Sequence, residues 1–535
     1  MRAEPAGDAA RLQVVRHALD GVAEMMGVAL QRSAYSPNIT ERLDLSAALF
    51  DPDGAMIAQA EHIPVHLGSM PASVRAVLDA FDLQPGMAAI INDPYTGGSH
   101  LPDMTLVTAV GDARGRPLGF VANRAHHADV GGAAPGSMPA DAVDIAMEGL
   151  RVPPTLLVDT HGERGDVIAL LAANSRTPDE RLGDLRAQFA ANHTGARRLA
   201  QLAAERSSDG LIADMAALLT YAERRLRAAI RTMPDGSWQA VDVLEGGGPD
   251  GAGLQLRTTV TIEGDAMTVD LRDCPAQVPA NINAVRAVAE SAALFVLRLL
   301  ADPTAPANAG AARPLTVLTT PGTVVDARFP APVATGNVET SQRLVDLLLR
   351  ALAPALPDRV PAASQGTMNN VLIGSRGTGT PFAYYETIGG GEGATPTRDG
   401  MHGIHTAMTN TRNTPVEALE LAYPLRVVRS ELRGGSGGPG LHRGGEGVVR
   451  EIEVLVDATV TLHTERRTVA PWGLAGGGDG ATGRNTLITA AGDARPLPAK
   501  TTLQVQAGDR IRIETPGGGG WGADQAATTR GHSPT

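Results

Sequence analysis

The residues with the clearest chemical potential lie between positions 92 and 132. This stretch holds His100, Asp103, His126, His127 and Asp129, set among glycines. Imidazole and carboxylate groups together are typical ligands of Zn²⁺, Mn²⁺ or Fe²⁺, and no cysteine lies nearby to favour a thiolate zinc site. A single loop histidine more often has a solvated or hydrogen-bonding role, so the prediction of a divalent-metal site depends on the whole group.

A β-hairpin would bring these residues together. The sequence predicts one strand at 104–110 and a second at 117–123, joined by a polar turn. Residues just before the first strand and just after the second should therefore emerge at the same end of the hairpin. Two adjacent histidines rarely bind one ion, so we expect one of His126 and His127 to be a ligand and the other a catalytic or supporting residue. The sequence leaves open which is which.

Three further candidates precede this stretch. Asp44 lies just before a predicted strand at 46–50, where it is either a metal ligand or an exposed residue. His62 and His66 flank Pro64 in a predicted loop, ahead of a helix expected to begin at Ser69. They either line the site or have structural roles.

More polar groups follow in loop-rich segments. A predicted strand at 87–92 delivers Tyr95 to the central stretch, and Glu148 is a second carboxylate in the loop beyond it. A later glycine cluster at 384–417 is too polar to be core, and we expect it to form a second wall of the site. Its candidate residues are Glu386, Glu392, His402, His405 and Asn410.

Composition excludes several classes of function. The net charge is −12, which argues against nucleic-acid binding. Lys500 is the single lysine, which leaves little scope for a phosphate-binding P-loop or a Schiff base. No apolar run approaches a membrane span, since Arg286, Glu290 and Arg298 interrupt the best candidate. No secretion signal is visible, and the single Cys274 fits a reducing cytoplasm.

Periodicity predicts an α+β chain with several domains. Residues 1–235 read as an N-terminal α/β region that carries the metal site. Residues 236–420 mix strands and helices, and 421–522 contain mainly short strands separated by glycine turns. Residues 523–535 read as a flexible tail.

The chain resembles the hydantoinase B/oxoprolinase family. Eleven blocks occur in family order over nearly the whole chain: ERLDLSAALFD, AEHIPVHLGSMPASV, NDPYTGGSHLPD, NRAHHADVGG, PGSMP, EGLRVPP, GDLRAQ, NVETSQR, NTPVE, RGGEGVVR and TPGGGGWG. Together they are specific for the family but not for a substrate.

The resemblance implies a division of labour. A separate A-type subunit would bind ATP and phosphorylate a cyclic amide, and this chain would complete the hydrolysis at a divalent metal in a cytoplasmic hetero-oligomer. The resemblance assigns Asp44, His100, Asp103 and His126 as metal ligands, with Zn²⁺, Mn²⁺ and Fe²⁺ all compatible. It assigns proton transfer to His127 and Asp129, or alternatively to His66. From their places in the loops near the site, we expect His62, Tyr95, Glu148 and Glu392 to contact the substrate.

Two other functions remain open at this stage. Related chains occur in ketone carboxylases, where the same site would join an activated enol to carbon dioxide. Alternatively, the chain is a metal-stabilised scaffold without catalytic activity. The substrate, the metal and the stoichiometry of the complex are not determined by these motifs.

Overall fold

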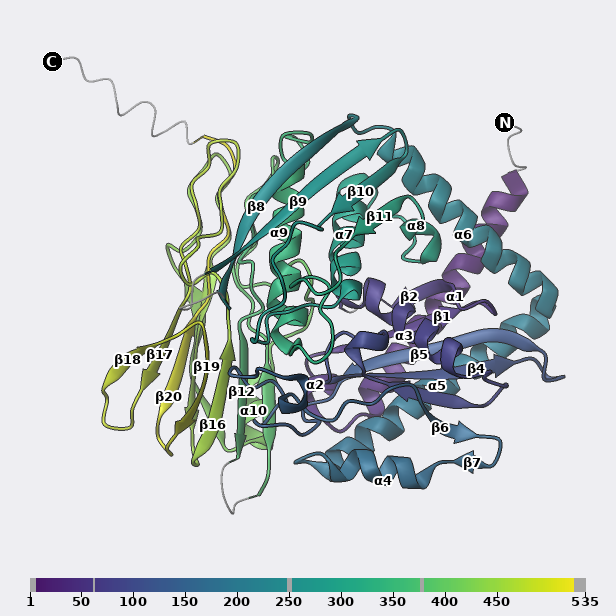
Figure 1. Ribbon diagram of the computed structural model, residues 1–535, viewed down its shortest axis with the longest axis horizontal. Coiled ribbons are helices and arrows are strands. Elements are labelled where there is room, and N and C mark those ends of the chain that lie inside the picture. The colour runs from purple at the N-terminus through teal and green to yellow at the C-terminus, as the bar shows by residue number, and fades with distance from the viewer. Residues whose placement is uncertain (1–5, 61–62, 248–252, 376–379, 524–535) are drawn as a thin grey trace.

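The protein is described by a computed structural model covering residues 6–60, 63–247, 253–375 and 380–523 (Figure 1). Within these residues the fold is α+β and multi-domain, as the sequence predicts, and it is built on several antiparallel or mixed sheets. None of the described helices is both long enough and apolar enough to span a bilayer.

A seven-stranded antiparallel sheet forms the N-terminal part. Its strand order is β2-β1-β5-β4-β3-β6-β7. The predicted central hairpin is confirmed, since β4 and β5 pair along their length; both are short apolar runs that are buried on both faces. The strands are β1 (Leu45–Phe50), β2 (Met56–Ala60), β3 (Ala88–Ile91), β4 (Asp103–Gly111), β5 (Pro117–His126), β6 (Thr155–Asp159) and β7 (Gly162–Glu163).

Helices cover both faces of this sheet. Leu49 of β1 packs in one apolar cluster with Leu19 of α1 (Ala6–Ser33) and Leu199 of α5 (Pro178–Arg206). The adjacent strand residue Ala48 packs in a different cluster, with Val74 of α3 (His66–Ala80). Successive strand residues therefore face α1 and α5 on one side and α3 on the other. The remaining helices of this part are α2 (Pro37–Thr40), η1 (Pro94–Thr96), η2 (Ile145–Met147), α4 (Gly165–Ala173) and α6 (Ser208–Ile230).

Helix α3 begins at His66, whereas the sequence suggested Ser69. The His66 N–H donates to Ile63 O at 3.1 Å, so the turn containing Pro64 leads directly into the helix. The Ser69 hydroxyl donates to Val65 O at 3.1 Å and thus lies in the first turn instead of capping it. The consequence for the site is that His66 sits on a helix and not in a loop.

A four-stranded sheet with three α-helices and a π-helix forms the middle of the molecule. Its order is β11-β10-β9-β8, and β10 and β11 run parallel. Its elements are β8 (Gly236–Gly247), β9 (Gly253–Glu263), β10 (Ala266–Asp270), α7 (Arg286–Ala301), α8 (Ala309–Ala312), β11 (Leu315–Leu318), the π-helix η4 (Gly336–Thr340) and α9 (Ser341–Leu352).

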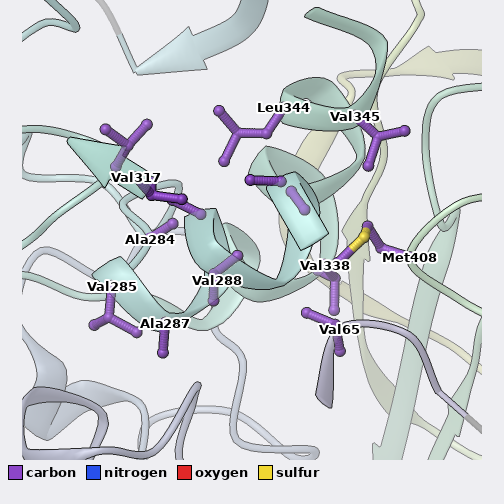
Figure 2. Packing of buried hydrophobic residues seen from close by; sticks show 14 of the residues in the cluster. Val65, Ala284, Val285, Ala287, Val288, Val317, Val338, Leu344, Val345 and Met408 are labelled. Atoms are coloured by element: carbon purple, nitrogen blue, oxygen red, sulfur yellow. The ribbon is translucent and has the colours of Figure 1, made fainter. Parts of the chain in front are cut away.

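The core of this middle part reaches the metal-site region. Figure 2 shows Val65, Val338 and Met408 gathered beside the α7 and α9 packing. These residues come from the segment before α3, from η4 and from the loop before α10. The Val65 N–H also donates to Met408 O at 3.4 Å. Three segments far apart in sequence are therefore held against one another.

Two further sheets complete the fold. One has the order β13-β12-β16-β19 and the other β14-β15-β20-β17-β18. The first sheet pairs strands that precede residue 420 with strands that follow it. The predicted boundary at 420 therefore does not separate one sheet from another. The elements are β12 (Asn370–Ser375), β13 (Ala383–Glu386), α10 (Val416–Ala422), β14 (Leu425–Arg433), β15 (Gly447–Val454), β16 (Ala458–His463), β17 (Arg484–Ile488), β18 (Ala494–Leu497), β19 (Lys500–Val505) and β20 (Arg510–Glu514). Of the predicted tail, residues 524–535 lie outside the described residues.

Glycine backbones pack directly against one another beside these sheets. We call this the glycine bundle; it comprises segments 389–393, 400–403, 437–445, 473–480 and 517–520. The Gly518 N–H donates to Gly445 O at 2.9 Å, and the Gly445 N–H donates to Glu392 O at 2.8 Å. A Cβ at Gly518 would lie 1.9 Å from Glu392 O, so only glycine permits this approach.

Candidate metal centre

The central hairpin brings the predicted ligands to one end of the seven-stranded sheet, where the interior strand β4 begins and β5 ends. Asp103 at the start of β4 is directly opposite His126 at the end of β5. Directly opposed residues point to the same face, which here is the α3 face. The His126 N–H donates to Asp44 O at 3.1 Å, which places Asp44, just before β1, beside them.

Asp103 is the centre of a buried group of imidazoles. Its Oδ1 lies 3.2 Å from His100 Nε2 and 3.4 Å from His126 Nδ1. Its Oδ2 lies 3.4 Å from His66 Nε2 and accepts a hydrogen bond of 2.6 Å from Ser99 Oγ. Potential ligand atoms of His100, Asp103 and His126 all lie within 4.8 Å of one another.

These residues suit a metal ion. The Nε2 atoms of His100 and His126 are buried without a hydrogen-bond partner, so two imidazole nitrogens remain available for coordination. A cavity of about 20 Å³ lies among these residues and is also lined by Asp44 and His66. A space of that size accommodates one ion or one water molecule.

Neighbouring groups fix the orientation of the imidazoles. His100 Nδ1 lies 3.3 Å from Ala334 O, and His66 Nδ1 lies 2.9 Å from Ser46 Oγ. The ring of Tyr385 stacks on His126 with centroids 4.5 Å apart and an interplanar angle of 17°. A donor contact at Nδ1 leaves the lone pair of His100 on Nε2, which faces the cluster.

The electrostatics favour an ionised Asp103 and neutral His66 and His126. Burial alone would raise the pKa of Asp103, but the His100 charge and contacts with His100, His126 and His66 hold it well below its usual range. Burial lowers the pKa of His66 and His126, against the opposing effect of Asp103. An ionised carboxylate and neutral imidazoles are the forms that bind metals.

Asp44 lines the same cavity but is not among the three residues with converging ligand atoms. Its Oδ2 lies 3.9 Å from Nη2 of the buried Arg42. The predicted ligand set is therefore brought together at the cavity, with Asp44 at its margin.

His127 and Asp129 do not reach the cluster. Because strand residues alternate, His127 faces α5, where its Nε2 lies 3.0 Å from Gln188 Oε1. The Asp129 carboxylate accepts hydrogen bonds from the Arg176 side chain at 2.9 Å and from backbone N–H groups, including Gly131. The geometry gives both residues structural contacts and does not support their predicted proton-transfer roles.

The predicted substrate contacts are dispersed. The Tyr95 hydroxyl donates to Ala331 O, and its ring lines a surface groove away from the cluster cavity. Both oxygens of Glu148 accept backbone hydrogen bonds. Glu392 pairs with Arg398 through contacts of 2.7 and 2.8 Å. His62 lies outside the described residues.

A larger pocket adjoins the cluster cavity. It has a volume of about 450 Å³, and Thr409 lines both spaces. The predicted second wall partly forms this pocket, through Glu392, His405 and Asn410. By contrast, Glu386 pairs with Arg450 at 3.1 Å, and His402 Nδ1 accepts from the Glu446 N–H at 2.8 Å.

Several supporting residues had no sequence signal of their own. Arg124 is fully buried; it donates to the Ser69 and Ser73 hydroxyls of α3 and to Thr105, and burial lowers its pKa to about 10. Arg42 lies 4.6 Å over the ring of Tyr385. Alternation along β5 places Arg124 on the His126 face, which is the one available clue.

Comparison with known proteins gives a consistent result. The family model described as "Hydantoinase B/oxoprolinase" matches residues 8–524. The chain is 38% identical to 5-oxoprolinase 1 of Arabidopsis thaliana, covering 98% of this chain but 42% of that protein. It is 32% identical to the B-type component of a putative D-/L-hydantoinase from a Pseudomonas species, covering 96% of this chain and 90% of that component.

A solved structure is similar over almost the full length. It is the ATP-dependent caprolactamase from Pseudomonas jessenii, with a TM-score of 0.90 and 30% identity. The match covers 98% of this chain and 94% of that chain.

Proposed function

Because the chain belongs to the hydantoinase B/oxoprolinase family, we propose that it is the metal-carrying subunit of an ATP-dependent enzyme that hydrolyses a cyclic amide. The observation that carries this proposal is the buried Asp103 group, in which His100 and His126 each leave a nitrogen unpartnered beside an ion-sized cavity. The names of the oxoprolinase, hydantoinase and caprolactamase relatives support the reaction class.

We assign the metal to His100, Asp103 and His126, with Asp44 adjoining them. A divalent ion there would supply a Lewis acid that polarises a carbonyl and favours ionisation of water near neutral pH. Two histidines and carboxylates suit Zn²⁺, Mn²⁺ and Fe²⁺. Asp103 would stay ionised and compensate the ion's charge.

We assign proton transfer to His66. It lines the cavity, and burial keeps its imidazole neutral and therefore able to accept a proton. Its Nδ1 contact with Ser46 would hold the ring while Nε2 faces the Asp103 carboxylate. The pocket that shares Thr409 with the cavity is the space we assign to the substrate ring.

We propose that ATP binds to an A-type partner and not to this chain. Amide resonance makes an unactivated ring carbonyl a poor electrophile, so prior phosphorylation would explain an ATP requirement. The chain spans about two fifths of the plant 5-oxoprolinase and most of the hydantoinase component; the name of the latter, as one component of a larger enzyme, supports an A-type partner.

The test is ATP turnover by this chain with the A-type protein encoded beside it. Substrates would be 5-oxoproline, hydantoins, simple lactams and acetophenone, each with and without bicarbonate. We expect ring opening that requires both proteins and ignores bicarbonate. Turnover only with the ketone and bicarbonate would instead establish a carboxylase, and activity that survives removal of the metal would establish a scaffold role.

A further inference from the structure

Glu148 is fully buried. Within the described part of the chain, its carboxyl group contacts backbone N–H groups and pairs with no charged side chain. It follows η2, and its Oε1 and Oε2 accept the N–H groups of Ala334 at 3.0 Å and Val333 at 3.1 Å. These two bonds direct both carboxyl oxygens toward the backbone. Burial raises the pKa of Glu148 to about 8.

The peptide segment that Glu148 holds also contacts a predicted metal ligand. Ala334 presents its N–H to Glu148 and its carbonyl oxygen to His100 Nδ1, which lies 3.3 Å away. Glu148 and His100 are thus joined through the backbone of one residue. Removing the carboxylate would leave two buried N–H groups without their acceptor and allow Ala334 to move.

We infer that Glu148 is a positioning residue for the metal centre: it fixes Ala334 so that His100 donates from Nδ1 and directs the Nε2 lone pair at the ion. This inference rests on the proposed metal-binding role of His100. Outer-shell partners of this kind fix the tautomer and the ring orientation of a ligating histidine.

A matched control is present elsewhere in the fold. Glu245 is also buried and accepts backbone N–H groups, from Arg467 at 2.9 Å and from Thr468 and Val469 at 2.8 Å. It does not line the cluster cavity. Glu245→Gln therefore reports the general effect of replacing a buried backbone-binding carboxyl group with an amide.

The experiment measures Zn²⁺ affinity of the full chain by competition with a chelator. We expect Glu148→Gln to weaken binding by roughly 10- to 100-fold, with Glu148→Asp less affected, and Glu245→Gln to leave affinity unchanged. The second readout is the ¹⁵N chemical shifts of the His100 imidazole in the metal-free chain, which should change in Glu148→Gln alone.

The possible outcomes distinguish failure of the positioning role of Glu148 from failure of the proposed metal site. Unchanged affinity and unchanged His100 shifts in Glu148→Gln would overturn the positioning role, even if the variant is less stable. Equal weakening by Glu148→Gln and Glu245→Gln would likewise reduce Glu148 to a structural role. If His100→Ala binds Zn²⁺ as tightly as the parent, the proposed metal site itself fails.

Discussion

His126 and His127 are neighbours in sequence but face opposite sides of the seven-stranded sheet. His126 points to the Asp103 group on the α3 face, whereas His127 contacts Gln188 on α5. The alternation of side chains along β5 thus separates a candidate ligand from a structural residue.

The two histidines should therefore respond differently to substitution. His126→Ala should abolish stoichiometric binding of metal because it removes a ligand. His127→Ala should preserve binding and lower the free energy of unfolding by about 1 kcal/mol through loss of the Gln188 contact. Metal content of the purified variants and urea unfolding test this; metal loss in His127→Ala alone would reverse the assignment.

Metal should stabilise the folded chain through Asp103. An ion at 100 times its dissociation constant adds about 2.7 kcal/mol to the free energy of unfolding when it binds only the folded state. The parent protein should show this gain on addition of Zn²⁺ or Mn²⁺, and Asp103→Ala should not. A gain of equal size in Asp103→Ala would place the ion elsewhere.

Asp129 should matter for stability and not for metal affinity. Asp129→Asn weakens the contact between the buried Asp129 carboxylate and the part-exposed Arg176, and we expect a loss of about 2 kcal/mol in the free energy of unfolding. The matched surface change Asp166→Asn removes an exposed pair with Arg164 and should cost less than about 1 kcal/mol. Weakened metal binding in Asp129→Asn would show instead that this carboxylate acts on the metal centre.

Glu339 should make stability depend on pH. Burial, together with the nearby Glu465, raises the pKa of Glu339 from 4.5 to about 8. Between these values the folded chain keeps a proton that the unfolded chain has released, so the contribution of this group to stability falls as pH rises.

Glu339→Gln should remove that dependence. Across this window, the free energy of unfolding of the variant should rise relative to that of the parent by at most about 1.4 kcal/mol per pH unit. Urea unfolding between about pH 5 and pH 8 measures it, with the exposed Glu163→Gln as the control that changes little. Parallel stability curves for parent and Glu339→Gln would contradict the expectation.

The glycine bundle should tolerate no side chain at its centre. Gly518→Ala would bring a Cβ to 1.9 Å from Glu392 O, and we expect a loss of about 3 kcal/mol in the free energy of unfolding. Gly434→Ala is the matched change, because a Cβ there meets no atom within 4 Å. Similar melting temperatures for the two variants would show that the bundle can relax.

The hairpin and the candidate ligands that it carries were predictable from local pattern. Two short apolar runs joined by a polar turn specify β4 and β5, and their pairing brings Asp103 and His126 together without any long-range information. The alternation of side-chain direction along a strand then separates His126 from His127. The early start of α3 was missed because the turn at Pro64 leads into a helix without a side-chain cap.

The residues that reach the site from the second half of the chain could not be predicted from local pattern. Tyr385, Ala334 and Thr409 reach the cavity or its ligands from segments more than 200 residues beyond His126 in the chain. Their placement depends on how the sheets pack together, which periodicity does not encode. The sheet that joins β12 and β16 across residue 420 escaped prediction for the same reason.

The glycine bundle also joins the pocket wall to a segment far along the chain. The Gly519 N–H donates to Ala363 O, and Gly519 O accepts from the Ala394 N–H. The backbone beside Glu392 and Gly393, which line the pocket, is therefore held in part by residues 517–520. We expect a chain truncated before residue 517 to lack a finished pocket wall.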